Sequence, residues 1–199
     1  AANGFCRDLD MYMVERVCEQ IRSWIDAGIE PIPISVNQSK LLFTEMDYPS
    51  RLEQTVKHYG IPSSLITLEI LEDIATDDLA HLNVQIELLH EKGFKVSMDD
   101  FGSGYSSLTM LYQLKIDELK LDRGFLKNVS EDNQKRRQII LHQIIQLANK
   151  LGISTVAEGI ETTRDRDNML SLSCDCGQGY LYDKPISAEE FSEKYMKRS

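Results

Sequence analysis

Two adjacent carboxylates, Asp99 and Asp100, follow a short apolar run and precede a loop rich in Gly, Ser and Tyr. Neighbouring aspartates repel each other unless a cation or hydrogen-bond donors neutralise them. Divalent cations such as Mg²⁺ prefer carboxylate and carbonyl oxygens, so a metal ion is the usual neutraliser. The glycines would let the loop backbone approach a ligand closely and move as a lid. Acidic pairs are also common in solvated loops, so the weight of this one depends on the other strand ends.

Strands and helices are expected to alternate through nearly the whole chain. The strand candidates are residues 31–37, 65–70, 94–98, 118–122, 154–158 and 179–182. The helix candidates are residues 10–27, 50–59, 77–92, 106–112, 133–151, 162–171 and 188–196. Strands separated by single helices pair in parallel through right-handed crossovers, in a doubly wound sheet or a closed (β/α)₈ barrel. No G-x-G-x-x-G motif follows the first strand, which removes the best support for a dinucleotide-binding fold.

Oxygen-bearing side chains or a lysine stand at the end of strand after strand. They are Asn37, Glu69, Asp99 with Asp100, Lys120, Glu158 and, just before the sixth strand, Gln178. In a parallel barrel all these ends face one rim, where active sites are built. Any one of these residues taken alone is more often a helix cap or a solvated charge. Their repetition favours an active site.

The residue types point to phosphodiester chemistry. Asn37, Glu69 and Asp99 can supply oxygens to one metal ion, and Asp100, expected to point elsewhere, can reach a second. Two metal ions clamp the attacking and leaving oxygens of a phosphodiester and lower the pKa of bound water from about 16 towards about 7. Lys120 offers a fixed positive charge. Glu158 can accept a proton or complete a metal shell.

Bulk properties restrict the class of protein. The 199 residues are 42% hydrophobic and 27% charged, as in a soluble globular protein. A formal net charge of −10 argues against a nucleic-acid polymer as partner but not against a small phosphorylated ligand. No membrane-length apolar run and no signal-peptide pattern occurs. Four cysteines without a C-x-x-C pair make a zinc site improbable and favour reduced thiols and a cytoplasmic location.

The chain resembles the EAL family of bacterial cyclic di-GMP phosphodiesterases. The motifs that carry the resemblance occur in the family's order and cover nearly the full length: Ser35-Val36-Asn37, Leu68-Glu69-Ile70-Leu71-Glu72, residues 99–108 (Asp-Asp-Phe-Gly-Ser-Gly-Tyr-Ser-Ser-Leu), Lys120-Leu121-Asp122-Arg123, residues 157–162 (Ala-Glu-Gly-Ile-Glu-Thr) and Gln178-Gly179-Tyr180. The resemblance implies a TIM-like (β/α)₈ barrel with one antiparallel strand. It also implies hydrolysis of cyclic di-GMP to linear pGpG at a two-metal site with Mg²⁺ or Mn²⁺.

The resemblance assigns a role to each matching residue. It implies metal ligation by Asn37, Glu69, Asp99 and Asp100. Asp122 would lie close to the second metal ion or its waters. Lys120 would help to position the hydrolytic water, and Glu158 would be a metal ligand or the general base.

Residues around these positions would support the site. Glu72 would brace the loop that follows Asp99, while Glu161 and Gln178 would support the metal and water shell. Gly102, Ser103 and Tyr105 are the candidates for substrate contact. Leu71 replaces a threonine that is usual in the family, which removes a hydroxyl near the site but no expected ligand.

Six strands are countable where a closed barrel needs eight. The family's first two strands, including the Glu-Ala-Leu motif whose glutamate binds metal, are expected before Ala1. Residues 1–199 are therefore interpreted as a single EAL domain that is incomplete at its N-terminus. The chain alone is expected to be inactive or poorly folded, because it lacks that glutamate and exposes sheet edges.

Three functions remain open. The first is a catalytic phosphodiesterase, and the second is a cyclic di-GMP receptor that binds without cleaving. Degenerate receptors generally lose several acidic rim residues, whereas every checkable rim position here has the expected type, which favours the enzyme. The third is an interaction scaffold without nucleotide binding. A homodimer and an upstream sensory or GGDEF domain, in a larger and membrane-linked protein, are further expectations.

Overall fold

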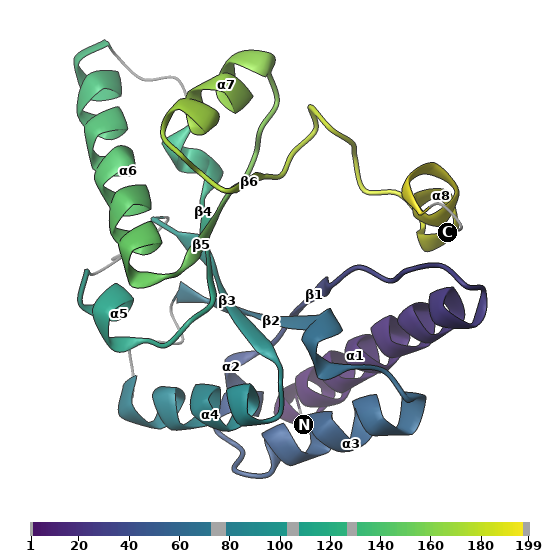
Figure 1. Ribbon diagram of the computed structural model, residues 1–199. Helices are drawn as coiled ribbons and strands as arrows, with labels where there is room; N and C mark the ends of the chain where they lie inside the picture. Colours follow the sequence, from purple (N-terminus) through teal and green to yellow (C-terminus); the bar gives the residue numbers. More distant parts are fainter. Residues whose placement is uncertain (1, 73–78, 103–107, 127–130, 197–199) are drawn as a thin grey trace. The chain divides into compact units, whose positions relative to one another are not determined.

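Six strands form one sheet in a computed structural model of the chain, which describes residues 2–72, 79–102, 108–126 and 131–196 (Figure 1). The strands are β1 (Ile34–Asn37), β2 (Ile66–Leu71), β3 (Lys95–Phe101), β4 (Glu118–Leu121), β5 (Ser154–Ala157) and β6 (Cys176–Gly177). They lie in the order β1-β2-β3-β4-β5-β6. The pairs β1–β2, β3–β4, β4–β5 and β5–β6 are parallel.

Helices connect the strands. They are α1 (Ala2–Asp26), α2 (Lys40–Phe43), α3 (Tyr48–Tyr59), α4 (Leu79–Glu91), α5 (Leu108–Gln113), α6 (Glu131–Leu151), α7 (Thr163–Ser171) and α8 (Ala188–Tyr195), with 3₁₀ turns at Ser63–Leu65 and Arg123–Phe125. Strand order follows chain order without a reversal, as in a (β/α)₈ barrel and unlike a doubly wound sheet. The predicted barrel-type fold class is confirmed.

The sixth strand was predicted at the wrong residues. Cys176 and Gly177 pair with Val156 and Ala157, so the sheet position beside β5 is filled before residues 179–182 are reached. Those four residues form a turn, in which the Tyr182 amide donates to the Gly179 carbonyl at 3.0 Å. The apolar and aromatic composition of residues 180–182 suggested a strand, but these residues lie in a turn, and Tyr180 and Tyr182 are exposed. The short helix α2 was also missed.

Contacts between residues divide the chain into two units. The first comprises Ala1–Ile70, Asp77–Val96 and Pro185–Ser199. In it, α1 buries Val14, Cys18 and Ile21, spaced by four and three residues, and packs beside α3 (Figure 1). The indole of Trp24 donates to the Ser192 hydroxyl at 2.7 Å, which fixes α8 to the C-terminal end of α1.

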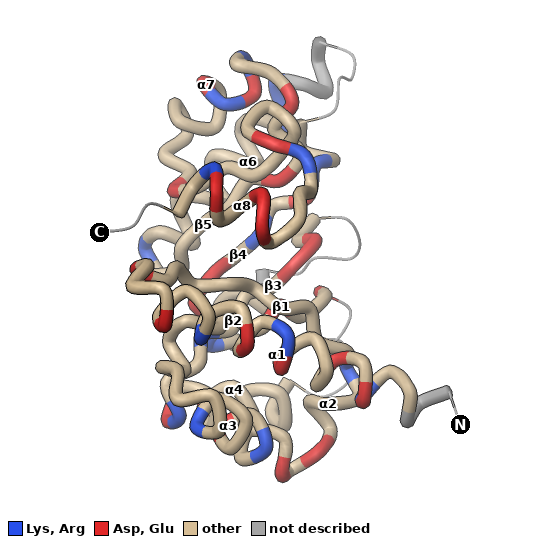
Figure 2. Tube along the Cα trace, turned by 90° about the vertical axis from the view of Figure 1, so that its right-hand side faces the viewer, with Lys and Arg blue, Asp and Glu red and all other residues tan. Residues whose placement is uncertain are grey.

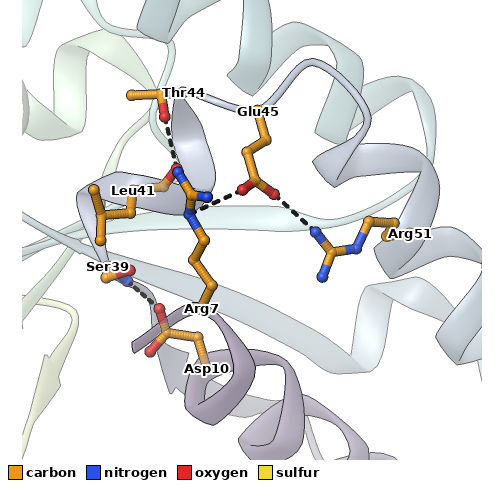
Figure 3. Close-up of polar contacts among 7 residues, drawn as sticks. All are labelled: Arg7, Asp10, Ser39, Leu41, Thr44, Glu45 and Arg51. Carbon is orange, nitrogen blue, oxygen red and sulfur yellow. Dashed lines mark hydrogen bonds and ion pairs between the residues drawn. The ribbon is translucent and has the colours of Figure 1, made fainter. Parts of the chain in front are cut away.

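The start of α1 is tied to the segment that follows β1 (Figure 3). Arg7 Nε lies 2.9 Å from Glu45 Oε1, and Arg51 Nη1 lies 2.7 Å from Glu45 Oε2. Asp10 Oδ2 accepts a hydrogen bond from the Ser39 amide at 2.9 Å. These contacts connect α1 to the segment that follows β1 and restrain the position of that segment.

The second unit comprises Leu71–Thr76 and Ser97–Lys184. Its helix α6 buries Leu141, Ile145 and Ala148 and packs against β5. Helix α7 begins with a capping box, in which the Thr162 hydroxyl accepts from the Asp165 amide and the Asp165 carboxylate accepts from the Thr162 amide. Acidic and basic residues are distributed over the helices of both units (Figure 2). In the described part of the chain, no helix is long and apolar enough to cross a membrane.

The four thiols are predicted to differ in reactivity. All are unpaired, with Cys6 and Cys176 exposed and Cys18 and Cys174 buried. Burial raises the pKa of Cys18 to about 12 and raises the pKa values of Cys174 and Cys176 above the ordinary range. Because the thiolate is the reactive form, Ellman's reagent at pH 8 should modify Cys6 first and Cys176 more slowly. Cys18 and Cys174 should react only on unfolding.

Mass spectrometry of quenched samples would assign each modified cysteine. In guanidinium chloride all four thiols should react at similar rates, which is the control for intrinsic reactivity. Modification of Cys18 in the native protein as fast as Cys6 would show that α1 is not packed as described.

Candidate active site

Strand β3 is irregular where its two aspartates lie. Met98 is the register partner of Leu119 and Phe101 that of Leu121, so two aspartates face the single residue Lys120. Asp100 has a φ of 57°, in the left-handed region that non-glycine residues seldom adopt. This is the geometry of a β-bulge, which bends a strand and changes the direction of a side chain.

The bulge brings carboxylates together that a regular strand would separate. Successive side chains of a regular strand point to opposite faces of the sheet. Here Asp99, Asp100 and Glu158 each offer a carboxylate oxygen, and these oxygens lie within 4.8 Å of one another. The sequence interpretation directed Asp100 elsewhere, whereas the bulge places its carboxylate beside that of Asp99.

Lys120 lies among these carboxylates. Its ammonium nitrogen is 3.0 Å from Asp99 Oδ1 and 2.9 Å from Glu158 Oε1. The Lys120 side chain is 7% exposed, and those of Asp99 and Glu158 are 14% and 19% exposed. At this burial the ion pairs are weakly screened by solvent, so the lysine compensates much of the repulsion between the two acids.

Compensation by one lysine is incomplete. Burial raises the pKa of Asp100, and the carboxylates of Asp99 and Asp122 raise it further. Burial also raises the pKa of Glu158, against the opposing hydrogen bond and charge of Lys120. Three acids and one ammonium group therefore leave a local excess of negative charge, an environment that favours a bound cation.

Backbone pairing fixes Glu158 directly after β5. The Glu158 amide donates to the Leu121 carbonyl at 3.0 Å, which continues the β4–β5 ladder by one residue. The Gln178 amide donates to the Ala157 carbonyl at 2.8 Å, and the Gln178 carbonyl accepts from the Ile160 amide at 3.0 Å. Gln178 thus contacts Ala157 and Ile160, which flank Glu158 and Gly159, through its main chain, and its side chain is exposed.

Two further predicted residues have their carboxylates bound to backbone amides. Asp122 Oδ1 accepts from the Gly124 amide at 2.7 Å and caps the 3₁₀ turn Arg123–Phe125. Glu72, which is 7% exposed, accepts from the Gly102 amide at 3.1 Å through Oε2. The second bond connects Glu72 to the first residues beyond β3. Ser103 and Tyr105 lie outside the described residues.

Asn37 and Glu69 lie in the first unit as register partners at the ends of β1 and β2. Glu69 is 7% exposed, and Asn37 is exposed. Gln38 follows them and was not among the predicted site residues, although it is 4% exposed and its amide donates to the Glu69 carbonyl at 2.9 Å. Its position next to the strand-end Asn37 was the available signal in the sequence. Glutamine is not a typical turn residue, so its type alone did not predict a role at the site. Glu161 is exposed, and its amide donates to Asp165 at 3.3 Å.

The donor set of the second unit fits a divalent cation. Hard cations such as Mg²⁺ and Mn²⁺ take oxygen ligands, and three partly buried carboxylates converge here within 4.8 Å. Among the described residues, no histidine or cysteine belongs to the group. The composition therefore favours an oxygen-preferring metal over zinc.

Comparisons with known proteins identify the family of the chain. A family model described as EAL domain matches residues 1–185. The signaling protein YkoW of Bacillus subtilis (strain 168) is 30% identical over 96% of this chain and 23% of its own length. The bifunctional diguanylate cyclase/cyclic di-GMP phosphodiesterase MucR of Pseudomonas aeruginosa is 33% identical over 94% of this chain and 27% of its own length. The chain thus spans about a quarter of the length of these curated relatives.

A solved structure has a similar fold. A solved structure of the PaMucR phosphodiesterase in complex with c-di-GMP matches with a TM-score of 0.85 and 32% sequence identity. The match covers 94% of this chain and 75% of that one. The chain therefore belongs to the EAL domain family.

Proposed function

We propose that this EAL domain hydrolyses one phosphodiester bond of cyclic di-GMP and releases linear pGpG, with a divalent metal as cofactor. The observation that carries the proposal is the cluster of Asp99, Asp100 and Glu158 around Lys120. It is supported by relatives named as cyclic di-GMP phosphodiesterases and by a similar structure in complex with c-di-GMP. A homodimer and an upstream sensory or GGDEF domain stay predictions.

The metal would be Mg²⁺ or Mn²⁺. The residues that would hold it are Asn37, Glu69, Asp99, Asp100, Asp122 and Glu158. Such cations, when bound, polarise phosphoryl oxygens and lower the pKa of water. The carboxylates keep an excess of negative charge beside Lys120, and this excess favours the binding of a cation.

Lys120 and Glu158 would act on the attacking water and the phosphoryl group. The Lys120 ammonium is held by Asp99 and Glu158, so its protons are fixed in direction and can orient the water and stabilise phosphoryl charge. As the bond from water oxygen to phosphorus forms and the phosphorus–oxygen ester bond breaks, the Glu158 carboxylate would take the water's proton. Its raised pKa suits it to this role. The leaving oxygen takes up a proton from solvent water, and Glu158 later returns its proton to solvent.

Glu72 would hold the segment after β3 in place for substrate. Its bond to the Gly102 amide restrains the first residue of the loop without using the side chains of that loop. Gly102, Ser103 and Tyr105 stay our candidates for contact with the nucleotide. Glu161 and Gln178 would support the site through the segments next to Glu158.

The proposal predicts Mg²⁺- or Mn²⁺-dependent conversion of cyclic di-GMP to pGpG by this domain together with the strands expected before Ala1, measured by chromatography. Glu158→Gln keeps the shape of the side chain but removes its negative charge. It should lower the hydrolysis rate by at least about 100-fold, the contribution of a general base. Thermal shifts of the wild type with cyclic di-GMP in Ca²⁺, which suppresses turnover, measure nucleotide binding separately from hydrolysis.

Two outcomes would contradict the proposal. Stabilisation by cyclic di-GMP without hydrolysis in Mg²⁺ or Mn²⁺ would identify a receptor. The absence of any thermal shift with the nucleotide would identify an interaction scaffold.

Lys120→Met should destabilise the metal-free protein, because Asp99 and Glu158 would lose their shared cation. Breaking a buried pair on one side costs about 3–5 kcal/mol, and the partial exposure of the acids places the cost for this variant at about 3 kcal/mol. Mn²⁺ should raise the free energy of unfolding more in Lys120→Met than in the wild type. Urea unfolding with and without Mn²⁺ measures both effects.

Lys57→Met is the matched control. Lys57 forms a 2.6 Å ion pair with Glu53, but its side chain is 70% exposed, so solvent screening leaves little to lose. Equal unfolding free energies for Lys120→Met and the wild type in EDTA would show that Lys120 does not compensate the acids.

Gly102→Ala should disturb the segment after β3. Gly102 has a φ of 97°, and an added methyl group would overlap the Phe125 ring. We expect kcat/KM for cyclic di-GMP to fall by about 100-fold, the effect of a displacement near 1 Å at a site. Gly28→Ala is the control, because Gly28 also has positive φ (70°) but has nothing within 4 Å of the added group. Equal kcat/KM values for the two variants would contradict the role of this segment.

A further inference from the structure

The peptide group that joins Asn37 to Gln38 is held at both ends. Its carbonyl oxygen, that of Asn37, accepts a hydrogen bond from Gln38 Nε2 at 2.7 Å. Its amide, that of Gln38, donates to the Glu69 carbonyl at 2.9 Å. Gln38 is thus bonded to the main-chain carbonyls of both strand-end residues to which the proposed function assigns metal oxygens in the first unit.

Gln38 is itself fixed by a buried tyrosine. The Tyr48 hydroxyl donates to Gln38 Oε1 at 2.6 Å. Tyr48 is fully buried, and its ring packs 5.4 Å from that of Phe43. Burial raises the pKa of Tyr48 well above its ordinary value, with Asp10 contributing, so the hydroxyl keeps its proton and remains a donor.

The next peptide group is restrained from a different helix. The Ser39 amide donates to Asp10 of α1 at 2.9 Å (Figure 3). Three consecutive residues after Val36 therefore have main-chain groups in directed bonds, two to neighbouring elements and one to the Gln38 side chain. The segment leaves β1 along a fixed path.

We propose that Gln38 and Tyr48 are positioning residues, which set the direction of the Asn37 side chain for metal binding by holding the Asn37–Gln38 peptide group. The inference rests on the proposed function, since it concerns the use of Asn37 as an oxygen donor. Fixing this peptide plane fixes ψ of Asn37, which sets the direction of the Cα–Cβ bond relative to the plane and restricts the rotamers of the side chain. Because Asn37 is exposed, packing of its side chain does little to orient it, and the backbone must do so.

A purely structural role makes a different prediction. A glutamine–tyrosine bond in a buried place could be replaced by a leucine–phenylalanine contact with little change in stability, because both polar partners disappear together. Single substitutions instead leave a buried polar group without its partner, which destabilises the fold. The double variant therefore separates stability from positioning.

The test measures Mn²⁺ affinity by electron paramagnetic resonance and the melting temperature in EDTA, on the same protein as the hydrolysis assay and without nucleotide. Hydrogen-bond partners behind metal ligands typically change affinity by about 10–100-fold, so Gln38→Leu should weaken Mn²⁺ binding about tenfold or more. Tyr48→Phe, one bond further away, should weaken it less. Gln38→Leu/Tyr48→Phe should recover the melting temperature but keep the affinity loss of Gln38→Leu.

Tyr59→Phe is the matched control. Tyr59 lies on the same helix, and its hydroxyl donates to Glu19 at 3.2 Å, away from Asn37. The same loss of a hydroxyl there should leave Mn²⁺ affinity at the wild-type value. Recovery of affinity together with the melting temperature in the double variant would overturn the inference and leave the proposed function intact. A wild-type chain that does not bind Mn²⁺ at millimolar concentration would overturn both.

Discussion

The ammonium group of Lys120 lies 3.0 Å from Asp99 and 2.9 Å from Glu158, and the arrangement of the acidic site depends on it. Partly buried carboxylates this close cannot all remain charged without a nearby cation, since their repulsion is weakly screened. The lysine supplies one positive charge, which is enough to hold two acids but not three. Burial raises the pKa values of Asp100 and Glu158, and the neighbouring carboxylates raise them further. The folded protein thus keeps an excess of negative charge, which a divalent cation neutralises better than another side chain would.

The bulge in β3 produces this excess of negative charge, because it places both aspartates on the side of Lys120. A regular strand would place only one of the two aspartates on the side of Lys120, and the second would face the opposite layer. Asp100 adopts a left-handed conformation instead, at a cost of order 1 kcal/mol for a residue with a side chain. Strain of this kind persists where the surrounding structure enforces it. Here the pairing of Phe101 with Leu121, immediately after the bulge, restores the register and holds the distortion in place.

Much of the fold could be predicted from local sequence rules. Glycines such as Gly60 follow helices and adopt the left-handed conformation that ends them. The apolar periods of α1 and α6 predicted those two helices. The sixth strand could not be placed, because a two-residue strand has no period and the neighbouring tyrosines imitate one. The bulge could not be predicted either, because the Asp-Asp pair does not show which residues of the partner strand it faces. Strand-end residue types identified the acidic cluster because that reasoning needs only chain order and side-chain chemistry.

The oxygen donors of the two units are oriented by different means, which explains why the sequence revealed some of their partners and not others. Asp99 and Glu158 are held by a charge, and a lysine at a strand end is conspicuous in a sequence. Asp122 and Glu72 are held by backbone amides, which no residue type announces. Asn37 carries no charge and gains little from electrostatic attraction, so its direction has to come from the peptide that follows it. That requirement accounts for a buried glutamine and a buried tyrosine where two apolar residues would pack as well, and only tertiary contacts reveal it.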